Sequence, residues 1–349
     1  MVSGYKYLSK EQRLAAIQRL TALWAFAESG LGGLMHALQI PFTGLVVGGM
    51  AVMIISLIAE ISEHDHKQVL KSALVVLIVK AMVSPYTPFP AYIAVSFQAM
   101  LGYALFSLFP INFFSILLLS SLAMLESAIQ KLLILTLFFG ESFWKATDQM
   151  VDFVASQFGI SSTNGSQWII AFYLFIYLAG GVFIAWMAYK TIKGFSAGKE
   201  VFILDHTATI NKELFEAGSV KRKTRYHKLW ALIIMLVVLS AVLFAFSGNT
   251  KQGWLAVLKT ISWTLSVILI WFMLVGPLFT KLIQKLLQKK ESRYSDEVLK
   301  TLAFLPMLKQ LTGLAWQKSR AFSGLTRWQF FFSALVHWTL TCSDPSQTE

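Results

Sequence analysis

The chain has 349 residues, of which 56% are hydrophobic and only 14% are charged, and its mean hydropathy is +0.61. Soluble domains carry about 25% charged residues, so this composition excludes an ordinary soluble protein. The net charge of +12 could indicate a nucleic-acid partner. Basic residues also gather in the loops of membrane proteins, where they set the orientation, and we favour this second interpretation.

Apolar runs of about 20 residues recur along the chain and predict membrane-spanning α-helices. They do not show the alternating pattern of short barrel strands. The sequence therefore predicts an all-α polytopic membrane protein, with a six-helix N-terminal bundle, two further transmembrane helices and an amphipathic C-terminal tail. The eight predicted helices cover residues 10–37, 42–61, 68–84, 91–109, 111–139, 165–190, 228–247 and 254–285.

Basic residues are distributed unevenly between the connections. Four Lys or Arg residues lie in the first 19 residues, nine lie in 190–228 and ten lie from 281 onwards, whereas 141–164 contains only Lys145. Eight spans with both termini in the cytoplasm place all the basic segments on the cytoplasmic side. We therefore expect a multi-pass protein of the cell (inner or cytoplasmic) membrane. Three connections rich in Pro, aromatic and hydroxyl residues then lie outside: 37–41, 84–92 and 140–165.

Composition divides the chain into four segments. We expect a six-helix membrane domain over 1–195, a basic cytoplasmic linker over 196–227, two transmembrane helices over 228–290 and a cytoplasmic or amphipathic tail over 291–349. The tail mixes Leu, Phe and Trp with spaced basic residues, which is typical of a helix on a membrane surface or against a partner. A packed cytosolic helix pair is an alternative, as is a ninth span near 328–342.

Five ionisable residues of the first six predicted spans are candidates for a position inside the membrane: Glu28, His36, Lys80, Glu126 and Lys131. A charge at the centre of a spanning helix costs about 2.5–3.5 kcal/mol, so such residues often mark a functional site. They lie from mid-membrane outwards, on the same half as the three outer loops, and predict a polar cavity open to the outside. A structural ion pair between Glu126 and Lys80 is the alternative for those two, and Glu28 and His36 could lie at a wet interface.

The chain contains no recognisable catalytic or metal motif. It lacks the phosphate-binding pattern G-x-x-x-x-G-K-[ST], H-E-x-x-H and G-x-S-x-G. His64 and His66 flank Asp65, but residues two apart face different ways on a helix, and we favour a solvated loop. The sequence thus predicts no metal site, no cofactor, no nucleic-acid partner and no enzymatic activity.

Three stretches of the N-terminal half share features with one family of transport proteins. "QRLAAIQRLTALWAFAES" carries small residues at Thr21, Ala25 and Ser29, "IPFTGLVVGGMAVMIISLIA" follows the first outer loop, and "SPYTPFPAYIAVSFQAMLGY" joins a Pro- and aromatic-rich loop to a Gly-containing helix. With six helices, this layout resembles the substrate-binding S component of energy-coupling factor (ECF) vitamin and metal transporters, over residues 10–190. The resemblance implies docking of Thr21, Ala25 and Ser29 on a transmembrane coupling subunit, with cytosolic ATPases supplying the energy. S components normally end after helix six, so the later residues have no counterpart.

The leading hypothesis is a membrane substrate-binding or transport protein that takes up a small solute, vitamin-like or metal, from the outer side. Aromatic residues would supply contact area and a few polar groups would orient the solute. The alternatives are a non-transporting scaffold or assembly factor, acting through the linker and tail, and an intramembrane lipid-modifying enzyme with Glu28 and His36 as acid and base. The predicted substrate-binding residues are Glu28, His36, Gln39, Lys80, Tyr86, Tyr92, Gln98, Lys131, Trp144 and Asn164.

Overall fold

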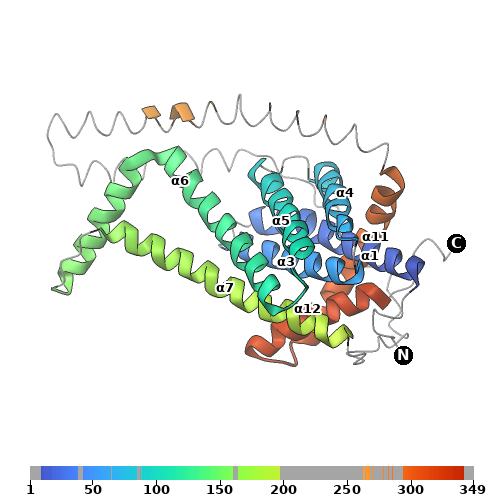
Figure 1. Cartoon of the computed structure of the whole chain (residues 1–349). Coiled ribbons are helices and arrows are strands. Elements are labelled where there is room, and N and C mark those ends of the chain that lie inside the picture. Colours follow the sequence, from blue (N-terminus) through green and yellow to red (C-terminus); the bar gives the residue numbers. More distant parts are fainter. Residues whose placement is uncertain are drawn as a thin grey trace. The chain divides into compact units, whose positions relative to one another are not determined.

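The computed structural model describes residues 9–37, 42–63, 65–84, 89–159, 164–196 and 294–341, together with isolated positions elsewhere. All regular elements in this part of the chain are helices (Figure 1). They are α1 (Lys10–Phe26), η2 (Ala27–Leu31), α2 (Gly32–Ala37), α3 (Thr43–Ile61), α4 (Lys67–Val83), α5 (Phe89–Leu108), α6 (Phe113–Gln157), α7 (Gly165–Ser196), α11 (Ser295–Ser319) and α12 (Gly324–Thr341).

Four of these helices, α3, α5, α6 and α7, are long and apolar enough to cross a membrane. The all-helical class is therefore confirmed for the described residues, and the chain has the helices of a multi-pass membrane protein. Helices α1 and α4 have 17 residues each and are shorter than a typical span. The predicted helix 228–247 and most of 254–285 lie outside the described residues, so the six-plus-two arrangement stays a prediction.

The described residues belong to two compact units. Unit 1 contains α1 to α5, α6 up to Gln130, α7 from Phe172, and both α11 and α12. Unit 2 contains α6 from Lys131 and α7 up to Ala171. The tail helices thus belong with the N-terminal helices, whereas composition had suggested a separate segment.

Helix α1 lies at the centre of unit 1. Leu20, Leu23 and Trp24 are 0% exposed, and the residues between them are also buried, so the second half of the helix is covered on every side. The neighbours of α1 are α3, α4, α11 and α12. A helical segment that is enclosed all round is a core element, whereas the charged beginning of α1 is largely exposed.

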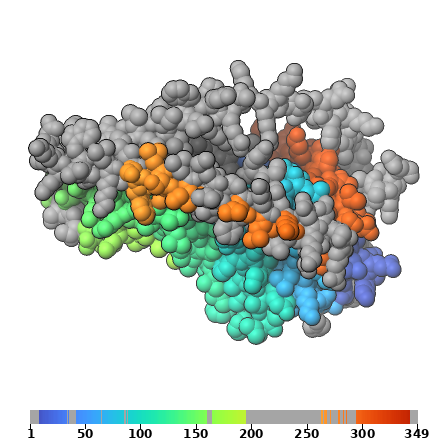
Figure 2. All heavy atoms as spheres, turned by 90° about the horizontal axis from the view of Figure 1, so that it is seen from above, coloured from blue at the N-terminus to red at the C-terminus, as the bar shows by residue number. Residues whose placement is uncertain are grey.

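Helices α11 and α12 pack on α1 and on each other. Figure 2 shows α11 beside α4, which it also contacts. The Arg19 guanidinium of α1 donates to the backbone oxygen of Leu340 at 2.6 Å, and Lys190 of α7 donates to Gln329 at 3.0 Å. Of the alternatives for the tail, the structure therefore shows a packed helix pair, formed on the chain's own first helix.

Unit 2 is built around a break in α6. Gly140 has φ +68° and ψ −163°, a conformation that only glycine adopts readily, and helix resumes directly after it. The expectation of an irregular connection over 140–165 is therefore wrong for 141–157, which is helical to Gln157. Charged residues of this segment support the helix and its partner: Lys145 pairs with Glu141 one turn away, and Asp148 accepts from the Ser166 backbone N–H at 2.7 Å.

Candidate functional site

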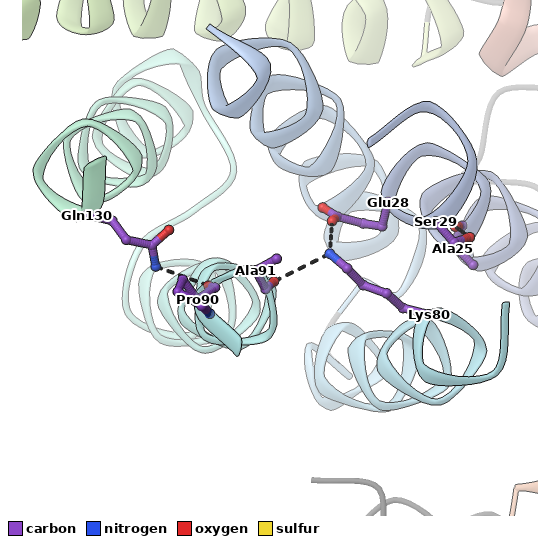
Figure 3. Close-up of polar contacts among 7 residues, drawn as sticks. All are labelled: Ala25, Glu28, Ser29, Lys80, Pro90, Ala91 and Gln130. Atoms are coloured by element: carbon purple, nitrogen blue, oxygen red, sulfur yellow. Dashed lines mark hydrogen bonds and ion pairs between the residues drawn. The ribbon is translucent and has the colours of Figure 1, made fainter. Parts of the chain in front are cut away.

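A buried ion pair joins two of the charged residues singled out by the sequence. Lys80 Nζ donates to Glu28 Oε2 at 2.7 Å, and the two side chains are only 4% and 6% exposed (Figure 3). Both residues lie in unit 1. A buried charge that loses its partner is strongly destabilising, so each of these residues requires the other. The suggested pairing of Lys80 with Glu126 is wrong, because Glu28 occupies that role.

The local backbone explains how Glu28 reaches Lys80. Glu28 belongs to η2, a single π-helical turn between α1 and α2. A π turn accommodates one extra residue, which changes the direction of the side chains on it, and such turns are frequent at functional sites. Lys80 lies in the last turn of α4, where the helix dipole favours a positive charge.

The first turn of α5 completes the surroundings of the pair. Lys80 Nζ also approaches the backbone oxygen of Ala91 at 3.4 Å and lies 5.9 Å from the centre of the Tyr92 ring. Gln130 of α6 donates to the neighbouring backbone oxygen of Pro90 at 3.0 Å (Figure 3). Polar contacts therefore connect η2, the last turn of α4, the first turn of α5 and the middle of α6.

A second polar cluster involves Gln98, one of the predicted binding residues. Gln98 is 2% exposed and lies in α5, and its Oε1 has no hydrogen-bond partner among the described residues. Glu126 of α6 likewise has a buried oxygen, Oε2, without a hydrogen-bond partner among the described residues. Gln130 donates to the other carboxyl oxygen of Glu126, Oε1, at 3.3 Å, and the Ser127 side chain lies beside the same carboxyl group.

The structure brings three of the predicted residues together in unit 1 and assigns three others to unit 2. Glu28, Lys80 and Tyr92 meet at the ion pair. Lys131, Trp144 and Asn164 belong to unit 2, where Lys131 and Asn164 are exposed and Trp144 donates to Thr136 at 3.0 Å. Gln39 and Tyr86 lie outside the described residues, as does the side chain of His36.

The residues predicted to dock on a coupling subunit are buried within the chain itself. Thr21, Ala25 and Ser29 are 4%, 0% and 7% exposed. Thr21 donates to Ser72 of α4 at 2.7 Å, and the hydroxyl of Ser29 bonds to the backbone oxygen of Ala25. A partner could reach these residues only if helices of this chain moved away.

Sequence reasoning missed several neutral polar residues. The charge and aromatic-loop patterns did not point to Ser127, Gln130 and Tyr177, because these residues are uncharged and lie within predicted helices. One signal was present: Gln130 lies four residues after Glu126, the spacing at which side chains meet on one helix face. No comparable pattern pointed to Tyr177, which comes from a distant helix.

A shallow hollow of about 390 Å³ lies at the other end of α4 from Lys80. It is lined by Asp65, His66, Lys67, Tyr103 and Ser107. No three His, Cys, Asp or Glu side chains come together as a metal site among the residues that the structure describes. In the predicted orientation this hollow faces the cytoplasm, away from the expected entry side.

Comparisons with known proteins found no match: no family model fits the sequence, and no curated protein or solved structure is significantly similar to it.

Proposed function

We propose that this chain is a membrane substrate-binding or transport protein that takes up a small polar solute, vitamin-like or metal, from the outer side. The observation that carries the proposal is the buried Glu28–Lys80 pair, held by a π turn beside an aromatic ring. Ionisable residues inside membrane bundles are costly and most often serve a substrate or ion path. A solute with matching polar groups can also bind at an ion pair, because its own donor and acceptor can replace the contact between the two side chains.

The charges at the Glu28–Lys80 pair indicate which kind of solute would fit. Lys80 is neutralised by Glu28, so its ammonium group is not free to bind an anion alone. A solute with both a donor and an acceptor group fits this pair better than a simple anion. The Tyr92 ring, 6% exposed, supplies the apolar wall that small-molecule sites require.

The resemblance to ECF S components supports uptake powered by separate ATPase subunits, with both termini in the cytoplasm. The scaffold alternative assigned its contacts to 190–228 and 296–349. Helices α11 and α12 already bury Leu308, Leu311 and Leu335 in unit 1, which leaves less of the tail for partners. We therefore favour solute binding over scaffolding.

The test is a binding screen with the full chain in lipid nanodiscs. Vitamins and metal ions are added singly, and binding is measured by thermal shift and then by calorimetry, with ATPase activity assayed in parallel. We expect one solute to bind without ATP hydrolysis. The double variant Glu28→Gln/Lys80→Met, which removes both charges together, should weaken this binding at least about tenfold, as expected for lost hydrogen bonds to charged groups.

The exposed pair Glu141–Lys145 supplies a matched control, since Glu141→Gln/Lys145→Met also removes one charge of each sign. Binding should be unchanged in this control. A screen in which no solute binds, or binding that survives loss of the buried pair, would contradict the proposal.

A further inference from the structure

The cluster around Gln98 and Glu126 is distinct from the Glu28–Lys80 pair and has a specific imbalance. Its two unpartnered buried atoms, Gln98 Oε1 and Glu126 Oε2, are both oxygen acceptors. Buried polar groups nearly always have a partner, and an unpaired one is especially costly in a membrane bundle. The cluster therefore has two buried acceptor atoms without a hydrogen-bond donor or a positive charge to satisfy them.

Two glycines of α3 lie against the amide group of Gln98 and the hydroxyl groups of Ser127 and Tyr177. A Cβ atom on Gly48 would lie 3.1 Å from Gln98 Nε2 and 3.8 Å from Ser127 Oγ. A Cβ atom on Gly44, one turn earlier, would lie 3.5 Å from Ser127 Oγ and 3.8 Å from the Tyr177 hydroxyl. The absence of side chains at these two positions thus lets polar groups of α5, α6 and α7 gather beside α3.

The local charges decide which ligand suits the cluster. Lys80 already neutralises Glu28, so the carboxylate of Glu126 is left as the unbalanced charge among the described groups of these two sites. Carboxylate, amide and hydroxyl oxygens are the ligands that hard cations prefer. One negative charge with neutral oxygen atoms matches a monovalent ion rather than a divalent one.

We propose that Gln98, Glu126 and Ser127, with the Tyr177 hydroxyl nearby, form a binding site for a monovalent cation, Na⁺. The ion would be held between α5, α6 and α7, next to the glycine face of α3. This site does not depend on the identity of the solute or on the uptake proposal. In a transport protein it would supply a coupling or structural ion.

The experiment measures the thermal unfolding midpoint of the full chain in nanodiscs as NaCl replaces choline chloride at constant ionic strength. Constant ionic strength keeps the screening of surface charges equal. Na⁺ should raise the midpoint by several degrees, because an ion that binds only the folded state stabilises it. Binding of radioactive sodium to the same sample gives an independent readout.

Variants then locate the effect. Glu126→Gln, which preserves the shape of the side chain, should abolish the Na⁺ shift and the bound radioactivity. Gln98→Met removes the acceptor oxygen and should raise the half-saturating Na⁺ concentration at least about tenfold. Ser127→Ala should weaken binding by a smaller factor.

Matched controls lie on the same helix. Ser120→Ala removes a buried α6 hydroxyl that donates to the Gly181 backbone oxygen, and Glu141→Gln removes an exposed acid; both should keep the Na⁺ response. A wild-type protein without a Na⁺-specific shift, as expected if Glu126 merely carries a proton, would overturn the proposal. A shift that persists in Glu126→Gln or Gln98→Met would also overturn it. No solute is present in this assay, so its failure leaves the uptake proposal to its own test.

Discussion

At the scale of single residues, Glu28 and Lys80 show how a buried charge is tolerated in this fold. Each is almost fully enclosed, and the short contact between them replaces the water that both have lost. The sequence identified both residues, because charges within apolar runs are conspicuous. It did not identify their pairing, since they are 52 positions apart and the π turn that directs Glu28 has no sequence signature.

Breaking the pair should therefore be more harmful than removing it. We expect Lys80→Met or Glu28→Gln alone to lower the free energy of unfolding by about 3–5 kcal/mol, because one charge stays buried without a partner. The double variant should be more stable than the sum of the two single effects predicts. Thermal unfolding of all four proteins in the same detergent measures this coupling, and strictly additive effects would show that the two groups do not interact.

Gly140 offers a second test at this scale. Its backbone conformation is one that a residue with a Cβ atom adopts only at a cost of about 1–3 kcal/mol, so Gly140→Ala should lower the unfolding midpoint. Gly313→Ala serves as the control, because Gly313 lies in α11 and its Cβ would contact nothing within 4 Å. Equal midpoints for Gly140→Ala and the wild type would exclude the break in α6.

At the scale of helices, hydrophobic periodicity located the elements well and their ends less well. The predicted helices 42–61 and 68–84 differ from α3 and α4 by at most one residue at each end. The end of α6 was missed because the aromatic and hydroxyl residues of 140–165 suggested an outer loop, whereas residues 141–157 are helical. The continuation depends on Gly140, a backbone conformation that the sequence does not reveal.

Glycines set how closely these helices approach. A Cβ atom on Gly102 of α5 would lie 2.5 Å from Ile55 Cγ2 of α3, a methyl group that is fixed close to its backbone. Gly102→Ala should therefore destabilise the protein by about 1–3 kcal/mol through overpacking. Gly194→Ala, in open space on α7, should be neutral or slightly stabilising. Detergent unfolding curves compare the two, and a neutral Gly102→Ala would contradict the close packing of α3 and α5.

At the scale of the whole molecule, the association of α11 and α12 with α1 was not visible in the sequence. Composition placed these helices in a separate tail, because a basic segment intervenes and their hydrophobic faces could equally cover a membrane or a partner. The face that they cover is the centre of α1, where Leu20 and Trp24 are fully enclosed. Such long-range pairings depend on tertiary packing, which no local pattern encodes.

Truncation after residue 293 should consequently disrupt the helix packing of unit 1 and not merely shorten the chain. The shortened chain loses two of the four helices that pack on α1, and we expect it to aggregate in size-exclusion chromatography, whereas the full chain should elute as a single peak. Co-expression of 294–349 as a separate polypeptide should restore part of the monodisperse protein. A truncated chain that stays monodisperse and unfolds at the wild-type midpoint would show that α11 and α12 are dispensable.

The pairing of α1 with α11 also has a consequence for biosynthesis. The ribosome makes α1 first and α11 near the end, and at ordinary elongation speeds the interval is on the order of half a minute. During that time the surface of Leu20 and its neighbours cannot reach its final partner. A nascent chain in this state would benefit from an insertase or chaperone that shields the first helix until the last ones arrive.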